Sequence, residues 1–278
     1  MTVNDWLADA SYKLKAAGIK TNRLDALVLL EDMTKKDRAY LLAYPEKTLS
    51  STNVLKLDTQ IKRRSAHEPL AFIRGKTEFY GREFIINKDV LEPRPETETI
   101  IELLKKLVEP GRDNITIVDI GTGSGALAIT AKLEFPKSFV MATDIDPKCL
   151  VLARRNAKKN AVKIEFRQGD LLEPVFNVHR HITALVCNLP YVPNDYRVNR
   201  AAAMEPRQAI YGGPDGLDIY RQLFGQIQTS ALPVQYIFTE SLPPQHKGLE
   251  KIAGHVGYSL KLSDDFIQVF SNQMISRS

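Results

Sequence analysis

The chain has 278 residues, of which 44% are hydrophobic and 26% are charged, and its formal charge at pH 7 is +5. These values are ordinary for a soluble protein that buries one large core and one smaller core, so we expect two domains. No apolar stretch approaches the roughly 20 residues that span a bilayer, and the segment around Trp6 lacks the apolar run of a secretory signal. We therefore expect a cytoplasmic protein that does not bind a membrane.

Cysteine and histidine usage argues against disulfide and metal chemistry. Cys149 and Cys187 are far apart in segments that we expect to be buried, which fits small apolar side chains in a reducing compartment. Among the histidines only His179 and His181 are close in sequence, and no cysteine or carboxylate cluster completes a zinc site around them. We expect no metal.

The pattern of the first 75 residues predicts helices. Apolar residues recur at helical spacing in each segment, glycine or proline ends several of the patterns, and no strand signal separates them. We expect a helical bundle that forms an N-terminal domain, residues 1–75. Its helices are expected at residues 4–17, 23–33, 37–44 and 51–66.

The pattern changes after the bundle. Residues 78–86 read as two short strands about a glycine turn, which predicts a β-hairpin linker, residues 76–92. Helical segments then alternate with β-branched runs, which is typical of parallel β-α-β units, so residues 93–278 are expected to form an α/β domain. Its strands are expected at residues 116–120, 139–143, 163–168, 182–187 and 236–239, with a terminal hairpin at 258–262 and 266–270.

A glycine-rich loop follows the first strand of this domain. Its glycines let a ligand approach the backbone closely, with the amides of the next helix facing it. The loop alone also fits a dinucleotide fingerprint, which leaves a nicotinamide cofactor open. Asp119 at the strand end can bind the ammonium of a methionine moiety but would repel a pyrophosphate, and this favours S-adenosylmethionine. The expected cofactor-binding residues here are Asp119, Gly121, Thr122, Gly123 and Gly125.

Two further acidic residues end the next strands. Asp144 lies 19 residues beyond Gly125, where a carboxylate can accept hydrogen bonds from both ribose hydroxyls. Asp170 follows the next strand and can reach the adenine amino group, although such an aspartate is by itself more often a turn residue. Because ligands bind at the carboxyl ends of parallel strands, we assign Asp144 to the ribose and Asp170 to the adenine.

After the fourth strand comes Asn188-Leu189-Pro190-Tyr191, which could be no more than a proline-rich loop. An amide nitrogen is a poor nucleophile because its lone pair is delocalised. Methyl transfer to it requires the nitrogen to be held in line and both N–H groups to be accepted. The Asn188 side-chain carbonyl and the Leu189 main-chain carbonyl are the expected acceptors, with Pro190 holding Leu189 extended and Tyr191 beside the planar group. We predict that these four residues are catalytic and that Asn188 also faces the cofactor.

These residues together resemble the HemK/PrmC family of release factor glutamine methyltransferases, over nearly the whole chain. The glycine loop and the Asn-Pro-Pro-Tyr type of motif are shared with amino-methyltransferases at large, whereas the other blocks are specific to the family. These blocks are Arg63-Arg64 with residues 68–71, Phe79-Tyr80-Gly81 with residues 91–98, and residues 205–217 with Glu205-Pro206 and Asp215-Gly216-Leu217.

The resemblance implies a seven-stranded, Rossmann-like class I methyltransferase sheet behind a small helical bundle domain and a β-hairpin linker. It also implies that the enzyme uses S-adenosylmethionine to methylate N5 of the glutamine in the Gly-Gly-Gln motif of peptide chain release factors. We further expect a monomer. The helical domain would bind the factor and no stable nucleic acid. A basic run such as Lys62-Arg63-Arg64 is usually a solvated helix face. Because residues 1–75 hold 13 Lys and Arg against 9 Asp and Glu, contact of this run with the factor is the functional hypothesis.

Two departures from the family pattern stand out. Leu189 replaces the first proline of Asn-Pro-Pro-Tyr, and we expect activity to survive because leucine keeps the acceptor carbonyl. Residues 240–245 lack the glycine that usually follows the glutamate in relatives, and the sequence offers no explanation for this.

Other functions stay open at this point. A ribosomal-protein glutamine methyltransferase would share every catalytic residue. A nucleic-acid N6-adenine methyltransferase faces the same hydrogen-bonding problem, but residues from 76 onward hold 25 basic and 24 acidic residues and no long insertion for target recognition. A non-catalytic binding module is suggested only by Leu189.

Overall fold

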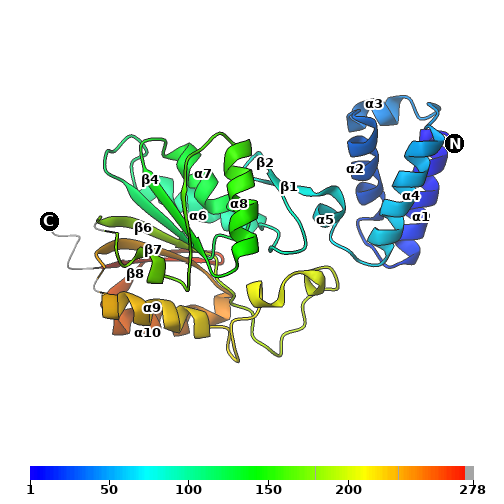
Figure 1. The fold of residues 1–278 in the computed structure, drawn as a ribbon. Coiled ribbons are helices and arrows are strands. Elements are labelled where there is room, and N and C mark those ends of the chain that lie inside the picture. The colour runs from blue at the N-terminus through cyan, green and yellow to red at the C-terminus, as the bar shows by residue number, and fades with distance from the viewer. Residues whose placement is uncertain (179, 231, 273–278) are drawn as a thin grey trace. The chain divides into compact units, whose positions relative to one another are not determined.

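The computed structural model describes residues 1–178, 180–230 and 232–272, and the chain folds into two compact units (Figure 1). One unit contains residues 1–76 and takes in the segment 198–204. The other contains residues 77–197 and those from 205 onward. In the described part of the chain, no helix combines the length and the apolar character needed to cross a bilayer. The domain boundaries drawn from the sequence stay a prediction.

The first unit is a helical bundle, as the sequence predicts. Its core contains Trp6, the only tryptophan of the chain, packed with fully buried leucines. Side chains of Thr2, Asp37 and Ser50 accept hydrogen bonds from backbone N–H groups and so begin three of the helices. The last helix was not predicted, because five residues are too short to show a period. The helices are α1 (Val3–Ala16), α2 (Asn22–Thr34), α3 (Arg38–Ala43), α4 (Ser51–Ser65) and α5 (Leu70–Arg74).

The two arginines at the end of α4 form ion pairs inside this unit. Arg64 Nε donates to Asp25 Oδ2 at 2.7 Å, and the two side chains are only 12% and 6% exposed. Arg63 pairs with Glu68 at the surface, where its side chain is 42% exposed. Each pair holds the end of α4 in place, so Arg64 is not part of an exposed basic face, whereas Arg63 remains partly exposed. Contact of this basic run with a partner stays a prediction.

The second unit begins with a two-stranded hairpin, β1 (Lys76–Phe79) and β2 (Arg82–Ile85). Tyr80 and Gly81 form its turn with φ values of +52° and +68°. Two positive φ values suit the right-handed twist of a tight hairpin, and glycine adopts them without strain. The predicted glycine turn is confirmed.

A seven-stranded sheet forms the centre of this unit within the described residues. Its strand order is β5-β4-β3-β6-β7-β9-β8, and only β9 runs antiparallel to its neighbours, which confirms the predicted α/β class and the terminal hairpin. The strands are β3 (Thr116–Ile120), β4 (Phe139–Asp144), β5 (Glu165–Gln168), β6 (Ile182–Cys187), β7 (Val234–Glu240), β8 (Tyr258–Asp264) and β9 (Ile267–Asn272).

Helices cover both faces of the sheet. Figure 1 shows α7 and α8 on one face and α9 and α10 on the other. Because both faces are covered, β3 and β6 are buried along their whole length. The chain builds outward from β3 to β5 and then returns to β6, so the order reverses between β3 and β6, where such sheets bind ligands. The helices are α6 (Glu98–Leu107), α7 (Ala126–Glu134), α8 (Pro147–Lys159), α9 (Asp218–Ser230) and α10 (His246–His255).

We predict that Arg64→Ala lowers the free energy of unfolding of the helical unit by about 3–5 kcal/mol, because it leaves the buried Asp25 carboxylate without its partner. The fluorescence of buried Trp6 during urea unfolding measures this. The matched control is Arg63→Ala, which breaks the exposed pair with Glu68 and should cost less than about 1 kcal/mol. Equal losses in the two variants would contradict the assignment.

Candidate active site

The glycine loop between β3 and α7 has a backbone shape that favours glycine. Its φ values are +71° at Gly121, +55° at Gly123 and +84° at Gly125, all in the left-handed region. The N–H groups of Gly121 and Thr122 both donate to the carbonyl of Thr143 at 2.9 Å, which folds the loop onto the end of β4. The loop thus has a fixed shape at the switch point of the sheet.

Asp119 at the end of β3 ties this loop to the helix that follows. Its Oδ2 accepts hydrogen bonds from Thr122 Oγ1 at 2.6 Å and from the Ala128 N–H at 3.1 Å. The residue is 1% exposed, and burial raises the pKa of its carboxyl to about 7. Asp119 therefore holds the loop against the start of α7.

Asp144 is held at the end of β4 by two backbone donors. The Gly123 N–H donates to Oδ2 and the Asp146 N–H donates to Oδ1, both at 2.9 Å. The side chain is mostly buried, and burial raises the pKa of its carboxyl. The first bond fixes the acid beside the glycine loop, which places the two predicted cofactor elements together.

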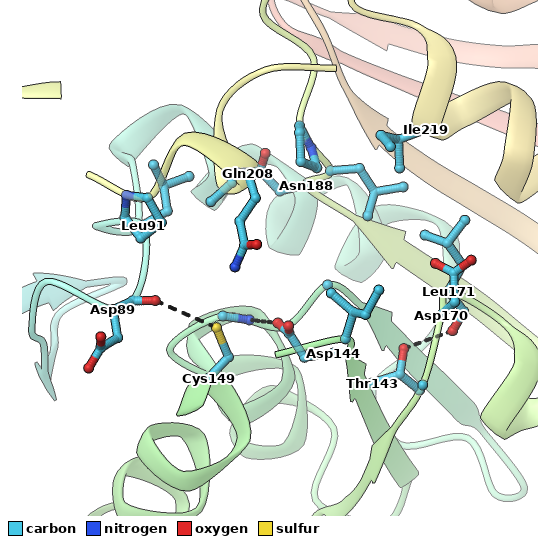
Figure 2. A pocket seen from close by; sticks show the side chains of 18 residues that line it. Asp89, Leu91, Thr143, Asp144, Cys149, Asp170, Leu171, Asn188, Gln208 and Ile219 are labelled. Carbon is cyan, nitrogen blue, oxygen red and sulfur yellow. Dashed lines mark hydrogen bonds between the residues drawn. The ribbon is translucent and has the colours of Figure 1, made fainter. Parts of the chain in front are cut away.

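A cavity of about 310 Å³ lies against these groups, within the roughly 300–1,000 Å³ of small-molecule sites. Figure 2 shows Asn188 and Gln208 on one side of it and Asp144 with Cys149 on the other. A smaller cavity of about 50 Å³ shares several of its residues and adds Asp119 and Thr122. Gly125 and Tyr191 line neither of these two cavities. The predicted residues that line the larger one are Gly121, Gly123, Asp144, Asp170, Asn188, Leu189 and Pro190.

Apolar and thiol side chains, which the sequence analysis did not propose for the site, also line the larger cavity. Leu91, Ile145 and Leu171 contribute, and the thiol of Cys149 lies 3.8 Å from the carbonyl oxygen of Asp89. Ile145 follows Asp144 directly and is 63% exposed, unusual for isoleucine. An apolar residue directly after a strand-end acid is the sequence signal that could have indicated this wall of the cavity. Together these residues form an apolar wall of the larger cavity.

Asn188 at the end of β6 is joined to a buried carboxylate through a threonine. Asn188 Nδ2 donates to Thr97 Oγ1 at 2.9 Å, and Thr97 Oγ1 donates to Glu240 Oε2 at 2.7 Å. Tyr191 donates its hydroxyl to the other oxygen, Glu240 Oε1, at 3.0 Å. Glu240 is 1% exposed, and burial raises the pKa of its carboxyl to about 7. Sequence reasoning assigned no role to Thr97 or Glu240.

Two oxygen atoms at this motif are available as acceptors. Among the described residues, none donates a hydrogen bond to Asn188 Oδ1 or to the carbonyl oxygen of Leu189. The Leu189 side chain is buried, and a Cβ on Gly121 would lie 3.0 Å from its Cδ2. The leucine that departs from the family pattern therefore packs against the glycine loop and leaves its carbonyl free.

The segment after the motif supports its backbone through glycines and one glutamine. A Cβ at Gly212 would lie 2.2 Å from Pro190 O, and a Cβ at Gly216 would lie 2.0 Å from Tyr191 O, so neither position accepts a side chain. Gln245 Nε2 donates to Tyr191 O at 2.7 Å. These contacts explain the glycines of the 205–217 block and give residues 240–245 a role in holding the motif.

The segment around Arg94 joins the same block through an ion pair. Arg94 contacts Glu205, whose side chain is 1% exposed, and Glu205 Oε1 also accepts the Glu92 N–H at 3.4 Å. This pair holds the segment that carries Thr97 against the chain that follows the Asn188 motif. The two family-specific blocks are thus in contact.

Among the described residues, no group of three or more His, Cys, Asp or Glu side chains could hold a metal ion. His179, one member of the only close histidine pair in sequence, lies outside the described residues.

Comparisons with known proteins identify the two parts of the chain. Residues 5–75 match the family model of the PrmC N-terminal domain, and residues 97–205 match the model of the methyltransferase small domain. The catalytic domain of hMettl16, solved in complex with MAT2A 3′UTR hairpin 1, shares the fold with a TM-score of 0.56 at 14% identity, over 88% of this chain and 89% of that one.

Curated relatives are closer in sequence. The release factor glutamine methyltransferase of Koribacter versatilis is 37% identical over 86% of each chain. That of Moorella thermoacetica is 36% identical over 92% of this chain and 91% of its own. Identity at this level across nearly the full length of both proteins shows that the chain belongs to the family of release factor glutamine methyltransferases.

Proposed function

We propose that this protein methylates N5 of the glutamine in the Gly-Gly-Gln motif of a peptide chain release factor. The enzyme is a methyltransferase whose cofactor is S-adenosylmethionine, as its family and fold establish. The observation that carries the proposal is the pair of acceptor oxygens, Asn188 Oδ1 and the Leu189 carbonyl, beside the cofactor cavity. One carboxamide NH₂ group has two hydrogens, and this pair can accept both.

The residues around the cavity fit the cofactor. S-adenosylmethionine supplies an electrophilic methyl group on a sulfonium. We assign its ribose to Asp144, its adenine to Asp170 and its methionine ammonium to Asp119. Gly121, Thr122, Gly123 and Gly125 form the loop that it would approach. Gly123 has open space where a Cβ would lie, whereas a Cβ on Gly125 would lie 3.1 Å from Ala153 and Ile129, so Gly125 supports the loop by close packing.

Asn188 and its neighbours would act on the substrate. Acceptance of both N–H groups orients the amide nitrogen and stabilises the positive charge that develops on it during transfer. Pro190 holds Leu189 extended, so that its carbonyl keeps its direction. Tyr191 has its hydroxyl committed to Glu240, and we assign its ring to the wall beside the planar group. The site needs no strong base, because a methylated amide nitrogen loses its proton readily.

We further propose that the protein works as a cytoplasmic monomer, without stable nucleic acid, and that the helical unit recognises the release factor. The relatives are named for release factor methylation, which supports this substrate. The net positive charge of residues 1–75 supports contact with an acidic surface, although Arg63 and Arg64 are engaged within the unit.

Mapping of the added methyl group tests the function. The enzyme is incubated with labelled S-adenosylmethionine and, in separate reactions, a release factor, ribosomal proteins, RNA and DNA. We expect one methyl group on the glutamine of the Gly-Gly-Gln motif and none on a release factor in which asparagine replaces that glutamine. A methyl group placed on a ribosomal protein or on adenine instead would contradict the proposal.

Replacement of Asn188 tests the acceptor pair. Asn188→Ala should lower kcat by about 10²- to 10³-fold, or about 2.7–4 kcal/mol, by analogy with the loss of one oxyanion-hole donor. Asn194→Ala, at an exposed position further along the same loop, is the control and should keep normal turnover. Near-normal kcat in a folded Asn188→Ala enzyme would refute the role.

Asp144→Asn tests the ribose contact. Because hydrogen bonds to a charged acceptor contribute about 1.5–3 kcal/mol, we expect the Kd for S-adenosylmethionine to rise about 10- to 100-fold in calorimetric titration. The control is Asp146→Asn, since asparagine begins a helix as well as aspartate does and Asp146 caps α8. A Kd for Asp144→Asn that matches the control would contradict the assignment of Asp144 to the ribose.

A further inference from the structure

The orientation of the Asn188 amide depends on a single hydroxyl proton. Thr97 has one such proton, and it goes to Glu240 Oε2 at 2.7 Å. Thr97 Oγ1 can therefore only accept from Asn188, and the group that faces it must be the NH₂ of the amide, as the 2.9 Å contact has it. The carbonyl oxygen of Asn188 is left for the substrate.

The opposite arrangement would disable the acceptor pair. If Glu240 donated a proton to Thr97, the threonine proton would turn to Asn188 and bind its Oδ1. The Asn188 NH₂ group would then face the two N–H groups of the substrate amide. The Asn188 NH₂ group and the substrate NH₂ group are both donors, so no acceptor would lie where the reaction needs one.

We propose that Glu240 is a positioning residue that, through Thr97, holds the Asn188 amide with its oxygen toward the substrate. The inference rests on the proposed role of Asn188. Glu240 lies at the end of β7 and Thr97 at the end of the short helical turn Pro95–Thr97, so the three residues come from segments far apart in the chain.

The surroundings of Glu240 set its protonation. Tyr191 donates to the carboxylate, and Tyr220 binds the Glu240 backbone, with its hydroxyl 2.7 Å from the carbonyl oxygen. Burial is the main cause that raises the pKa of Glu240 to about 7; the hydrogen bonds from Thr97 and Tyr191 lower it, and of the nearby charges Glu96 raises it and Arg94 lowers it. Burial also raises the pKa of both tyrosines, which therefore stay protonated as donors. Glu240 is thus mainly ionised above pH 7, where it can only accept hydrogen bonds. Below pH 7 it is mainly protonated and can also donate one.

A pair of variants at Thr97 separates positioning from packing. Thr97→Val keeps the shape but removes the hydroxyl, and we expect kcat to fall about 10- to 100-fold. Thr97→Ser keeps the hydroxyl and should recover most of that loss. Binding of S-adenosylhomocysteine, measured by calorimetry, should be the same in both. If serine and valine lower kcat equally in folded enzymes, the proposal is overturned.

The pH profile of kcat, with both substrates saturating, gives a second test. The wild-type profile should fall on the acid side with an apparent pKa near 7, and Glu240→Gln should abolish this fall because an amide does not titrate. Glu96→Gln is the control, since it should keep the fall and move it to slightly lower pH by removing a negative charge. An unchanged acid limb in Glu240→Gln would contradict the proposal.

Methyl mapping on the wild-type enzyme keeps the two ideas apart. If the wild-type enzyme methylates the glutamine but the Thr97 pair and the pH profiles fail, the positioning role falls and the function stands. If the methyl group is found elsewhere, the function itself falls.

Discussion

The hydrogen bonds from Asn188 through Thr97 to Glu240 are the contacts on which the proposed chemistry depends. A buried carboxylate is costly unless it is hydrogen-bonded, and Glu240 meets that cost with donors from Thr97 and Tyr191. These bonds set the direction of each donor and acceptor from Glu240 to Asn188. A poor nucleophile such as an amide gains most from such fixed groups, because they need not reorganise during the reaction.

The fold brings the members of this network to one place. The ends of β6 and β7 are neighbours in the sheet, and the buried hydroxyl of Tyr220 ties the Glu240 backbone close to that of Cys187. The ion pair of Arg94 with Glu205 holds the segment that carries Thr97. The family-specific blocks, which look unrelated in sequence, thus serve the same small volume.

The sequence predicted the sheet, most helices and the cofactor loop, because their signals are local: alternation, helical spacing and three glycines after a strand. The Asn188 motif was found for the same reason. Glu240 and Thr97 were missed because their bond joins residues 143 apart, and neither looks unusual in its own segment. The burial of Arg64 was not predicted, because its partner, Asp25, lies 39 residues earlier and a basic run at a helix end resembles a solvated face.

The most direct measurement is a crystal structure of the enzyme with S-adenosylhomocysteine and the release factor. The account predicts that the glutamine side-chain nitrogen lies within about 3 Å of both Asn188 Oδ1 and the Leu189 carbonyl oxygen, with Asn188 Nδ2 still on Thr97. A glutamine nitrogen bound away from this pair, or an Asn188 whose NH₂ group faces the substrate, would contradict it.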